Sequence, residues 1–245
     1  MAEPNEKVRV SFCWEGNRMR DELQLEAVQM NDTTLLSEER KRSRTQLYLC
    51  SKRVMDVFLS AAALVFLLPV FVIVALAIVL EDRGPVMFCQ TRIGKDNIPF
   101  TMYKFRSMCL NAEEKLAELA RLNERDGPVF KIAKDPRITK VGNFIRKTCI
   151  DELPQLINII KGDMSIVGPR PPLPKEVLQY SQYSMQRLRV TPGLTCFWQV
   201  QKGANTTFEE WVALDIKYIN ERNLWTDAKL IFMTIKVVLS GRGEF

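Results

Sequence analysis

The chain has 245 residues, enough for one domain of moderate size and an appendage, and none of them is histidine. This absence excludes Ser-His-Asp and Cys-His nucleophiles and His-ligated zinc, so carboxylates become the first candidates for acid-base or nucleophilic chemistry. Lysine and arginine outnumber aspartate and glutamate by 35 to 29, and the net charge of +6 favours partners that carry phosphate, such as nucleotides, nucleic acid or anionic lipid.

Residues 1–46 are expected to form an accessory or partly disordered N-terminal extension. They contain eight Lys or Arg and nine Asp or Glu with little periodicity. Within them, KVRVSFCW (7–14) alternates polar and apolar residues, which is typical of a short strand. Nothing in this segment indicates chemistry.

An apolar run of 24 residues without a charge, residues 57–80, predicts a membrane-anchoring helix within residues 47–82. Such a helix would be about 36 Å long, which is enough for a hydrocarbon core of about 30 Å. A secretory signal peptide is disfavoured because a long, mostly polar segment precedes the run. A helix buried in the core of the protein is the alternative.

Pro69 lies in the middle of the run, where it removes a backbone hydrogen bond and predicts a kink. Cations flank the run on both sides, at 40–53 and at 83–95. The positive-inside rule therefore does not decide between a helix that crosses the bilayer and one that enters, bends and returns. On the residues alone, both topologies stay open.

Beyond the apolar run, the periodicity predicts a small β-hairpin and several helices. Residues 84–94 and 100–108 alternate apolar and polar side chains around a turn at 95–99, which is typical of a hairpin. The fold class is therefore α+β and mainly helical. Helices are expected over residues 112–125, 153–162, 208–221 and 228–240, with turn-rich chain before Asp151 and an extended, proline-rich path over 169–174.

Two adjacent carboxylates, Asp151 and Glu152, stand immediately before Leu153 and Pro154, where a loop is expected to become a helix. Free backbone N–H groups at a helix start attract anions and can hold a phosphate. Adjacent carboxylates suit a divalent metal, and one of them could attack phosphorus to give an acyl phosphate. The alternative is helix capping, with Asp151 as N-cap and Glu152 in the first turn.

Cations surround this acidic pair in the sequence. Arginine forks match phosphate oxygens and lysine supplies a point charge, so together they predict a pyrophosphate or headgroup site, although solvated surface charge explains any one of them. Arg170 stands between two prolines, which lowers the entropy lost when it is presented to a ligand. The cations are Lys104, Arg106, Lys131, Lys134, Arg137, Lys140, Arg146, Lys147 and Arg170.

Three segments downstream of the apolar helix resemble a known family. They are KFRSM (104–108), DPRITKVGNFIRKTCIDELPQLINIIKGDMSIVGPRP (135–171) and TPGLT (191–195). With the proline-interrupted helix before them, they resemble the bacterial sugar transferases known as monotopic phosphoglycosyl transferases, over roughly residues 50–243. The resemblance implies a monotopic membrane protein with one proline-broken re-entrant helix. It implies three parts: an accessory extension (1–46), a membrane-anchoring helix (47–82) and a cytoplasmic catalytic domain (83–245).

The resemblance also implies the activity. A member of this family transfers a sugar 1-phosphate from a nucleotide diphosphate sugar, usually a UDP-sugar, to a polyprenyl phosphate, and releases UMP through a covalent phosphosugar-Asp intermediate. Mg²⁺ is the implied cofactor. By position in the motifs, Asp151 is the implied nucleophile and metal ligand and Glu152 its partner. The implied substrate-binding residues are Lys104, Arg106 and Arg146 for phosphate, Arg170 for the nucleotide, and Asp163 and Asp215 at further motif positions.

The implied partners are the nucleotide-sugar donor, the polyprenyl phosphate acceptor and membrane phospholipid, at the bacterial inner membrane with the catalytic domain facing the cytoplasm. This would be the first membrane step of glycan assembly, as for exopolysaccharide or lipopolysaccharide. Nucleic acid is not expected as a partner, because no helix-turn-helix or aromatic RNA-binding motif is present. Whether the protein forms a homo-oligomer is left open.

Two departures from the family pattern concern sugar recognition and membrane geometry. Residues 195–205 read TCFWQVQKGAN where the family usually has TGWAQVxGRN, and Leu68 takes the place of a small polar residue before Pro69. The alternative function is therefore a membrane-tethered, non-catalytic binding or scaffolding subunit of a glycan-assembly system.

Overall fold

The computed structural model describes residues 6–119, 121, 123–124, 127–129, 132, 135–201 and 207–240. The chain divides into two compact units, Met1–Cys50 and Ser51–Phe245. In the first unit, the described backbone is the beginning of helix α1 (Glu6–Asp82), so the strand expected over 7–14 is wrong. Eight alternating residues are a weak signal beside the helix formers that follow, since helix formation is cooperative along the chain. The division into extension, anchor and catalytic domain stays a prediction.

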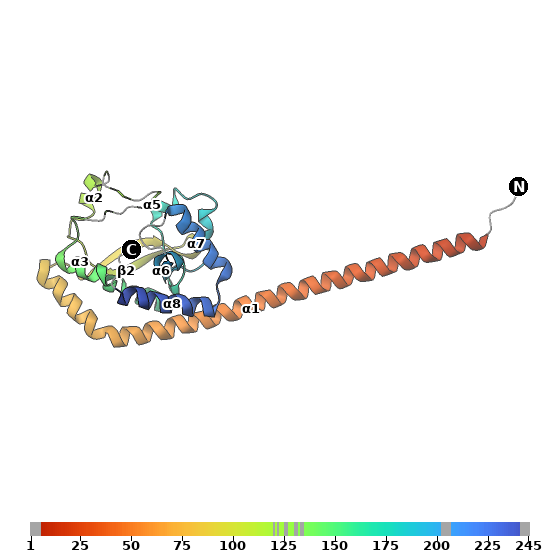
Figure 1. Cartoon of the computed structure of the whole chain (residues 1–245), viewed down its shortest axis with the longest axis horizontal. Helices are drawn as coiled ribbons and strands as arrows, with labels where there is room; N and C mark the ends of the chain where they lie inside the picture. Colours follow the sequence, from red (N-terminus) through yellow and green to blue (C-terminus); the bar gives the residue numbers. More distant parts are fainter. Residues whose placement is uncertain are drawn as a thin grey trace. The chain divides into compact units, whose positions relative to one another are not determined.

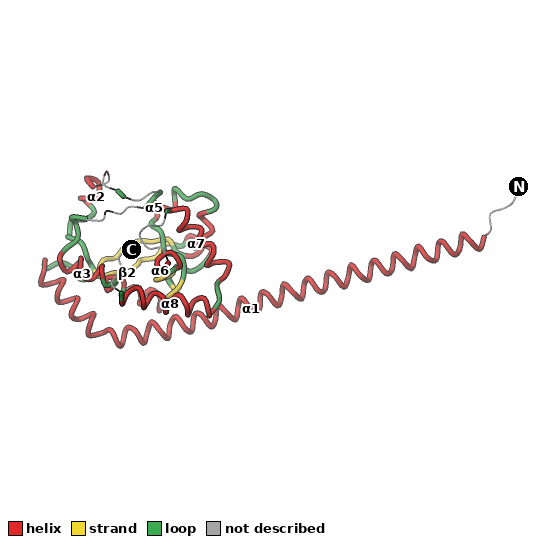
Figure 2. The backbone as a smooth tube through the Cα atoms, in the orientation of Figure 1, coloured by secondary structure: helices red, strands yellow, loops and turns green. Residues whose placement is uncertain are grey.

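The apolar part of α1 is one helix, Thr45–Asp82, that is long and apolar enough to cross a membrane. Its backbone stays helical through Pro69, so the break expected there is not confirmed, although the apolar part of α1 changes direction along its length (Figure 1). In the second unit this part of α1 curves along one edge of the fold (Figures 1 and 2). Its buried residues recur on one face and include Asp56, Ser60 and Val74, while Phe66, at 82% exposure, points away.

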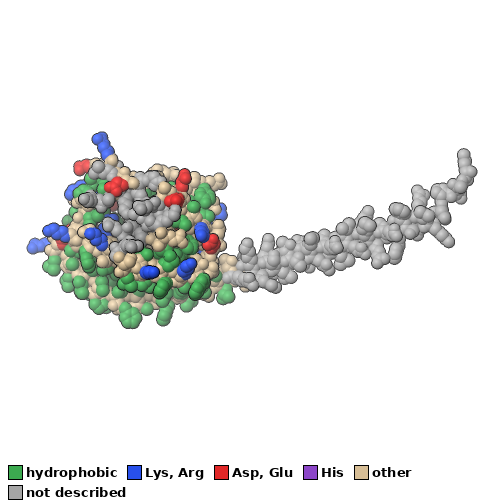
Figure 3. Space-filling view, viewed as in Figure 1, with side chains coloured by type: hydrophobic (Ala, Val, Ile, Leu, Met, Phe, Trp, Pro, Cys, Tyr) green, Lys and Arg blue, Asp and Glu red, His purple; other side chains and the backbone are tan. Residues whose placement is uncertain are grey.

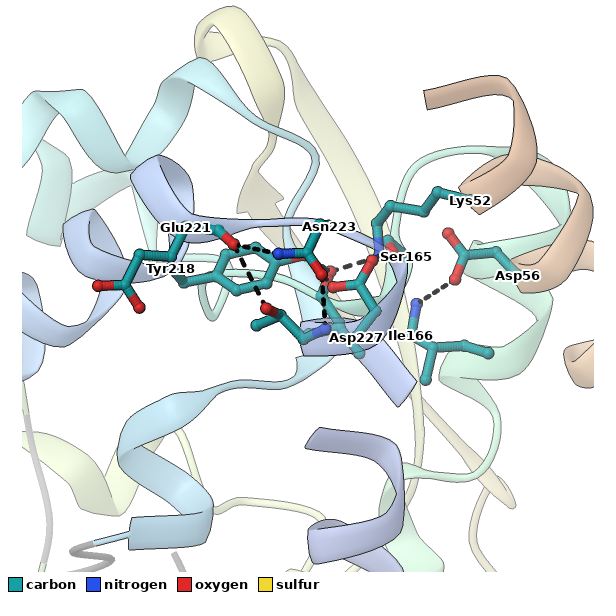
Figure 4. A network of polar contacts seen from close by, with 10 residues as sticks. Lys52, Asp56, Ser165, Ile166, Tyr218, Glu221, Asn223 and Asp227 are labelled. Atoms are coloured by element: carbon teal, nitrogen blue, oxygen red, sulfur yellow. Dashed lines mark hydrogen bonds and ion pairs between the residues drawn. The ribbon is translucent and has the colours of Figure 1, made fainter. Parts of the chain in front are cut away.

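Polar contacts attach this helix to the rest of the second unit. Lys52 forms a buried ion pair with Asp227, with 3.0 Å between Nζ and Oδ2. Asp227 also accepts a hydrogen bond from the Tyr218 hydroxyl at 2.8 Å, and the backbone N–H of Ile166 donates to Asp56 at 3.1 Å (Figure 4). Because buried charges are costly unless paired, these bonds specify where the helix docks.

The predicted hairpin is confirmed. Strands β1 (Met87–Ile93) and β2 (Pro99–Phe105) pair antiparallel from Met87↔Phe105 to Ile93↔Pro99. They are joined by the short 3-10 helix η1 (Lys95–Asn97). The side chains alternate between faces along each strand, which places Met102 in the core and Lys104 on the same face of β2.

A second, parallel pair of strands was not expected from the sequence. β3 (Ser165–Val167) pairs with β4 (Gly193–Thr195). Beyond the end of β3, Gly168 and Gly193 touch so closely that a Cβ atom on Gly193 would lie 2.0 Å from the Gly168 nitrogen. Glycine is therefore required for this approach, which fixes the start of the proline-rich path at 169–174.

The helices agree with the sequence in part. The helix expected over 112–125 is described only as α2 (Glu114–Leu119), and α3 (Lys140–Lys147), in the turn-rich chain, was not expected. The remaining expected helices are confirmed as α4 (Gln155–Lys161), α7 (Phe208–Glu221) and α8 (Leu224–Leu239). Short helices complete the fold: η3 (Ile150–Glu152), α5 (Pro174–Val177), η4 (Ser184–Arg189) and α6 (Phe197–Gln201).

Candidate active site

The acidic pair lies in η3, between two helices that are held independently. Thr139 caps α3 by accepting a hydrogen bond from the Gly142 N–H, and Cys149 then takes a left-handed backbone conformation with φ of 54°. The N-cap position of α4 is Pro154, without a side-chain cap. The capping interpretation of Asp151 is therefore wrong, and both carboxylates are left for another use.

Asp151 is buried and has no ion-pair partner among the residues that the structure describes. Burial raises the pKa of its carboxyl to about 6, with the charge of Glu152 acting in the same direction and that of Lys104 opposing it. Arg146 and Arg170 also lower this pKa at longer range. The carboxylate is thus ionised at neutral pH and surrounded by positive charge, although no cation neutralises it directly.

Glu152 has the opposite character. Lys104 of β2 lies 2.5 Å from its Oε1. Burial raises the pKa of Glu152, but Lys104, Arg170 and Arg92 outweigh that effect and hold it below the usual value. Glu152 is therefore a fixed anion that positions Lys104 beside the acidic pair.

Cys149 is the other conceivable nucleophile next to the acidic pair. Burial and the neighbouring charges of Glu152 and Asp151 raise the pKa of its thiol to about 12. The thiol therefore stays protonated at neutral pH, and the thiolate is the reactive form. Among the groups of this turn, Asp151 is the better nucleophile.

A small pocket opens beside Glu152 and Lys104. Its polar lining includes Gln155 of α4, Gln199 of α6 and two arginines, Arg92 of β1 and Arg170. The wall thus contains three cations, and Glu152 neutralises only Lys104 by direct contact. Such a surface suits a ligand with more than one negative charge.

The structure brings only some of the predicted residues together. Lys104 and Arg170 lie at the pocket and Arg146 is near enough to influence Asp151. Arg106 instead binds the side chain of Asp82 and the carbonyl of Pro85, at the end of α1. Its contact with phosphate stays a prediction. Lys131 and Lys134 lie outside the described residues, as does the segment 202–206.

The two further aspartates are bonded to partners outside the acidic pair. Asp163 accepts a hydrogen bond from the Asn158 side chain at 3.1 Å, where α4 ends. Asp215 of α7 is fully buried and bonded to Arg187, with 2.7 Å between Nε and Oδ2. Burial raises the pKa of Asp215 to about 6 even though Arg187 lowers it.

Sequence reasoning missed two arginines. Arg92 was seen only as a charge flanking the apolar run, and Arg187 was not singled out. Arg187 donates to the Tyr180 hydroxyl at 2.7 Å and to the Arg170 carbonyl at 3.3 Å, so it joins Asp215 to the proline-rich path. The sequence could have indicated Arg92, because it is a charged residue on the core-facing side of a strand. No local pattern in the sequence identifies Arg187.

Comparison with known proteins gives these residues a context. The family model described as bacterial sugar transferase matches residues 47–241. The chain is 49% identical over 164 residues to the galactosyl transferase CpsE of Streptococcus agalactiae serotype III (strain NEM316), which covers 66% of this chain and 36% of the relative. It is 41% identical over 192 residues to the UDP-glucose:undecaprenyl-phosphate glucose-1-phosphate transferase of Escherichia coli (strain K12). This match covers 75% of this chain and 39% of the relative.

A shorter relative is matched over most of its length. The exopolysaccharide production protein ExoY of Rhizobium meliloti (strain 1021) is 37% identical over 199 residues, covering 80% of this chain and 88% of the relative. By contrast, the chain spans less than half of the first two relatives. The matched part includes the acidic pair and all of the pocket residues named above.

Proposed function

The chain belongs to the bacterial sugar transferase family, and from this premise we propose that it transfers a sugar 1-phosphate from a nucleotide diphosphate sugar to a polyprenyl phosphate. The donor is a UDP-sugar and UMP is released. The observation that carries the proposal is an ionised Asp151 carboxylate that has no ion-pair partner among the described residues and adjoins Glu152 in the wall of a cationic pocket. The names of relatives, such as the Escherichia coli transferase, support this substrate pair.

The reaction proceeds in two displacements. An Asp151 oxygen attacks the phosphorus that bears the sugar, the bond from this phosphorus to the bridging oxygen breaks, and UMP departs with that oxygen. The phosphate of the polyprenyl acceptor then attacks the same phosphorus and frees the Asp151 carboxylate. The cations of the pocket stabilise the charge that develops on the phosphate oxygens.

Magnesium fits the donor set at Asp151. Mg²⁺ is commonly bound by one or two carboxylates together with substrate phosphates and water. Asp151 offers a carboxylate without an ion-pair partner in the described part of the chain, whereas Glu152 is engaged by Lys104. No described group of three or more Cys, Asp or Glu side chains could hold a metal by itself, so phosphate oxygens would complete the site. The bound ion would withdraw negative charge from the diphosphate.

The outward face of α1 and helix α8 support a membrane position. Hydrophobic side chains gather along the edge of the second unit where these helices run (Figure 3). On α8 they include Trp225, Phe232 and Ile235, with Trp225 at 78% exposure. Such a continuous apolar surface is typical of a membrane interaction site.

A re-entrant course of the apolar part of α1 accounts for the contacts at its two flanks. Before the apolar run Lys52 pairs with Asp227, and after it Asp82 pairs with Arg106, so both flanks are tied to the same compact unit. A helix that crossed the bilayer would carry one of these flanks to the far side. We therefore place the catalytic unit on one side of the membrane, and the family resemblance implies that this is the cytoplasmic side of the inner membrane.

The variant Asp151→Asn tests the proposal. It is isosteric and cannot act as a nucleophile, so UMP release from a UDP-sugar with polyprenyl phosphate is expected to fall by at least a thousandfold, while the protein still folds and associates with membranes. Turnover close to wild type would remove Asp151 from its role. Turnover absent from the wild type, with nucleotide still bound, would favour the scaffolding alternative.

Chelation tests the metal. Addition of EDTA is expected to stop UMP release, and added Mg²⁺ to restore it. Undiminished activity without divalent ions would refute the magnesium assignment.

A further inference from the structure

Two arginines of the pocket have no carboxylate partner among the described residues. Arg92 is 8% exposed, and its Nε and Nη2 donate to the Gln90 Oε1 at 3.1 and 2.7 Å while Nη1 donates to the Pro171 carbonyl at 3.0 Å. All of these acceptors are neutral. Arg170, one residue before Pro171, lines the same pocket.

An unneutralised, buried charge is energetically costly. Burial and the nearby charge of Arg170 lower the pKa of Arg92 to about 10, against the opposing charges of Glu176 and Glu152. The guanidinium therefore remains protonated at neutral pH in an environment that does not balance its charge. A bound anion would supply the missing counter-charge.

The other cation of the pocket is already engaged, because Lys104 is bonded to Glu152. The positive charge that remains lies on Arg92 and Arg170. The two are presented by separate segments whose backbones are bonded to each other, since the Ile93 N–H donates to the Pro172 carbonyl at 2.9 Å. The spacing of their backbones is thus fixed before a ligand arrives.

We infer that Arg92 and Arg170 form the subsite for the phosphate that leaves with the nucleotide, and that Arg92 contacts this phosphate directly. The inference rests on the proposed function, which supplies a diphosphate with one phosphorus attacked and one departing. Asp151 and Lys104 serve the attacked phosphate. Arg92 and Arg170 hold the departing one, so charge develops on the leaving oxygen beside two arginines.

Binding of the product UMP to the full-length protein in detergent tests the subsite. Arg92→Met removes the charge and keeps the aliphatic stem, and is expected to raise the Kd for UMP at least tenfold. Lys95→Met is the matched control, because Lys95 is a half-exposed cation on the turn of the same hairpin and is not part of the pocket lining. It should leave the Kd unchanged.

A purely structural role of Arg92, as a support for Pro171, gives a different result. Hydrogen exchange of the amides between 165 and 175 reports on that role. The inference predicts a weaker Kd with unchanged exchange in Arg92→Met. An unchanged Kd, or a weaker Kd accompanied by faster exchange of this segment, would overturn it. If Arg92→Met does not fold, Arg92→Lys decides, since loss of the guanidinium fork should weaken UMP binding about threefold and an unaltered Kd contradicts the direct contact.

Turnover is measured separately. A wild type that binds UMP through Arg92 yet releases none from UDP-sugars would keep the subsite and refute the proposed function. A wild type that turns over, with Arg92→Met binding UMP normally, would keep the function and refute the subsite.

Discussion

At the scale of single residues, two neighbouring carboxylates differ because one has a lysine in contact and the other does not. Lys104 holds Glu152 as an anion, whereas burial leaves Asp151 with a pKa of about 6. A nucleophile with a raised pKa is intrinsically stronger than an ordinary carboxylate and still ionised near neutrality. The ion pair with Lys104 thus makes Glu152 a fixed anion and leaves Asp151 as the nucleophile.

The activity is expected to fall as the pH decreases through about 6, because protonation of Asp151 removes the nucleophile. The charge of Lys104 lowers the Asp151 pKa, so Lys104→Met should move this acid limb to a higher pH as well as reduce the rate. The measurement is the pH profile of kcat/KM for UMP release.

Lys147→Met is the control for this profile, because Lys147 is exposed in the last turn of α3 and is not among the charges acting on Asp151. Its acid limb should match that of the wild type. An acid limb that stays in place in Lys104→Met would mean that Asp151 does not determine the profile.

The sequence was sufficient to identify Asp151 and Glu152 as a candidate acidic pair, because the two residues are adjacent in the chain. It was not sufficient to identify Arg92 or Arg187, whose roles depend on partners distant in the chain. Arg92 reaches the pocket because β1 pairs with the chain at 171–172, and Arg187 because it meets Asp215 in the core. Nor could the sequence distinguish the role of Arg106, just after β2, from that of Lys104 within it, although Arg106 binds Asp82.

At the scale of elements, the hairpin and the long amphipathic helices were predictable because each has its own periodicity. The strands β3 and β4 have three residues each, too few for a period, and their pairing is set by the contact of Gly168 with Gly193. Helix α3 was missed because its eight residues include Gly142, which is unfavourable in a helix and is required here by packing.

Gly142→Ala tests that requirement. A Cβ atom there would lie 1.9 Å from the Ser107 carbonyl oxygen, so α3 must move away from the chain that follows β2. We expect a loss of about 1–3 kcal/mol in the free energy of unfolding, the usual effect of overpacking, and a lower Tm. Asn143→Ala, at an exposed position of the same helix, should change the Tm little; equal melting of Gly142→Ala and wild type would contradict the packing argument.

At the scale of the whole molecule, the course of α1 in the membrane decides which side each end occupies. In a variant without other cysteines, Cys50 alone or Arg83→Cys alone should react with a membrane-impermeant thiol reagent from the same side of sealed inverted vesicles. The physical reason is that the flanks of the apolar helix are bonded to one compact unit. Labelling of the two sites from opposite sides would show a spanning helix.

The sequence predicted the length and apolar nature of this helix but not its docking. Its docked face follows from Lys52, Asp56 and Val74, which are buried against elements far along the chain. The hydropathy of the apolar run does not identify these distant contact partners.

Arg187 also has a consequence for how the fold opens. The Arg187 guanidinium joins Asp215 of α7, the Tyr180 hydroxyl and the Arg170 carbonyl, and its Cζ atom lies over the ring of Trp211, 4.8 Å from the ring centroid. None of these segments can detach without stranding the same charge in a dry interior. Fluctuations that release α7 must therefore also release the proline-rich path at 169–174. Helix α7 and this path thus open together, as one cooperative unit of the native state.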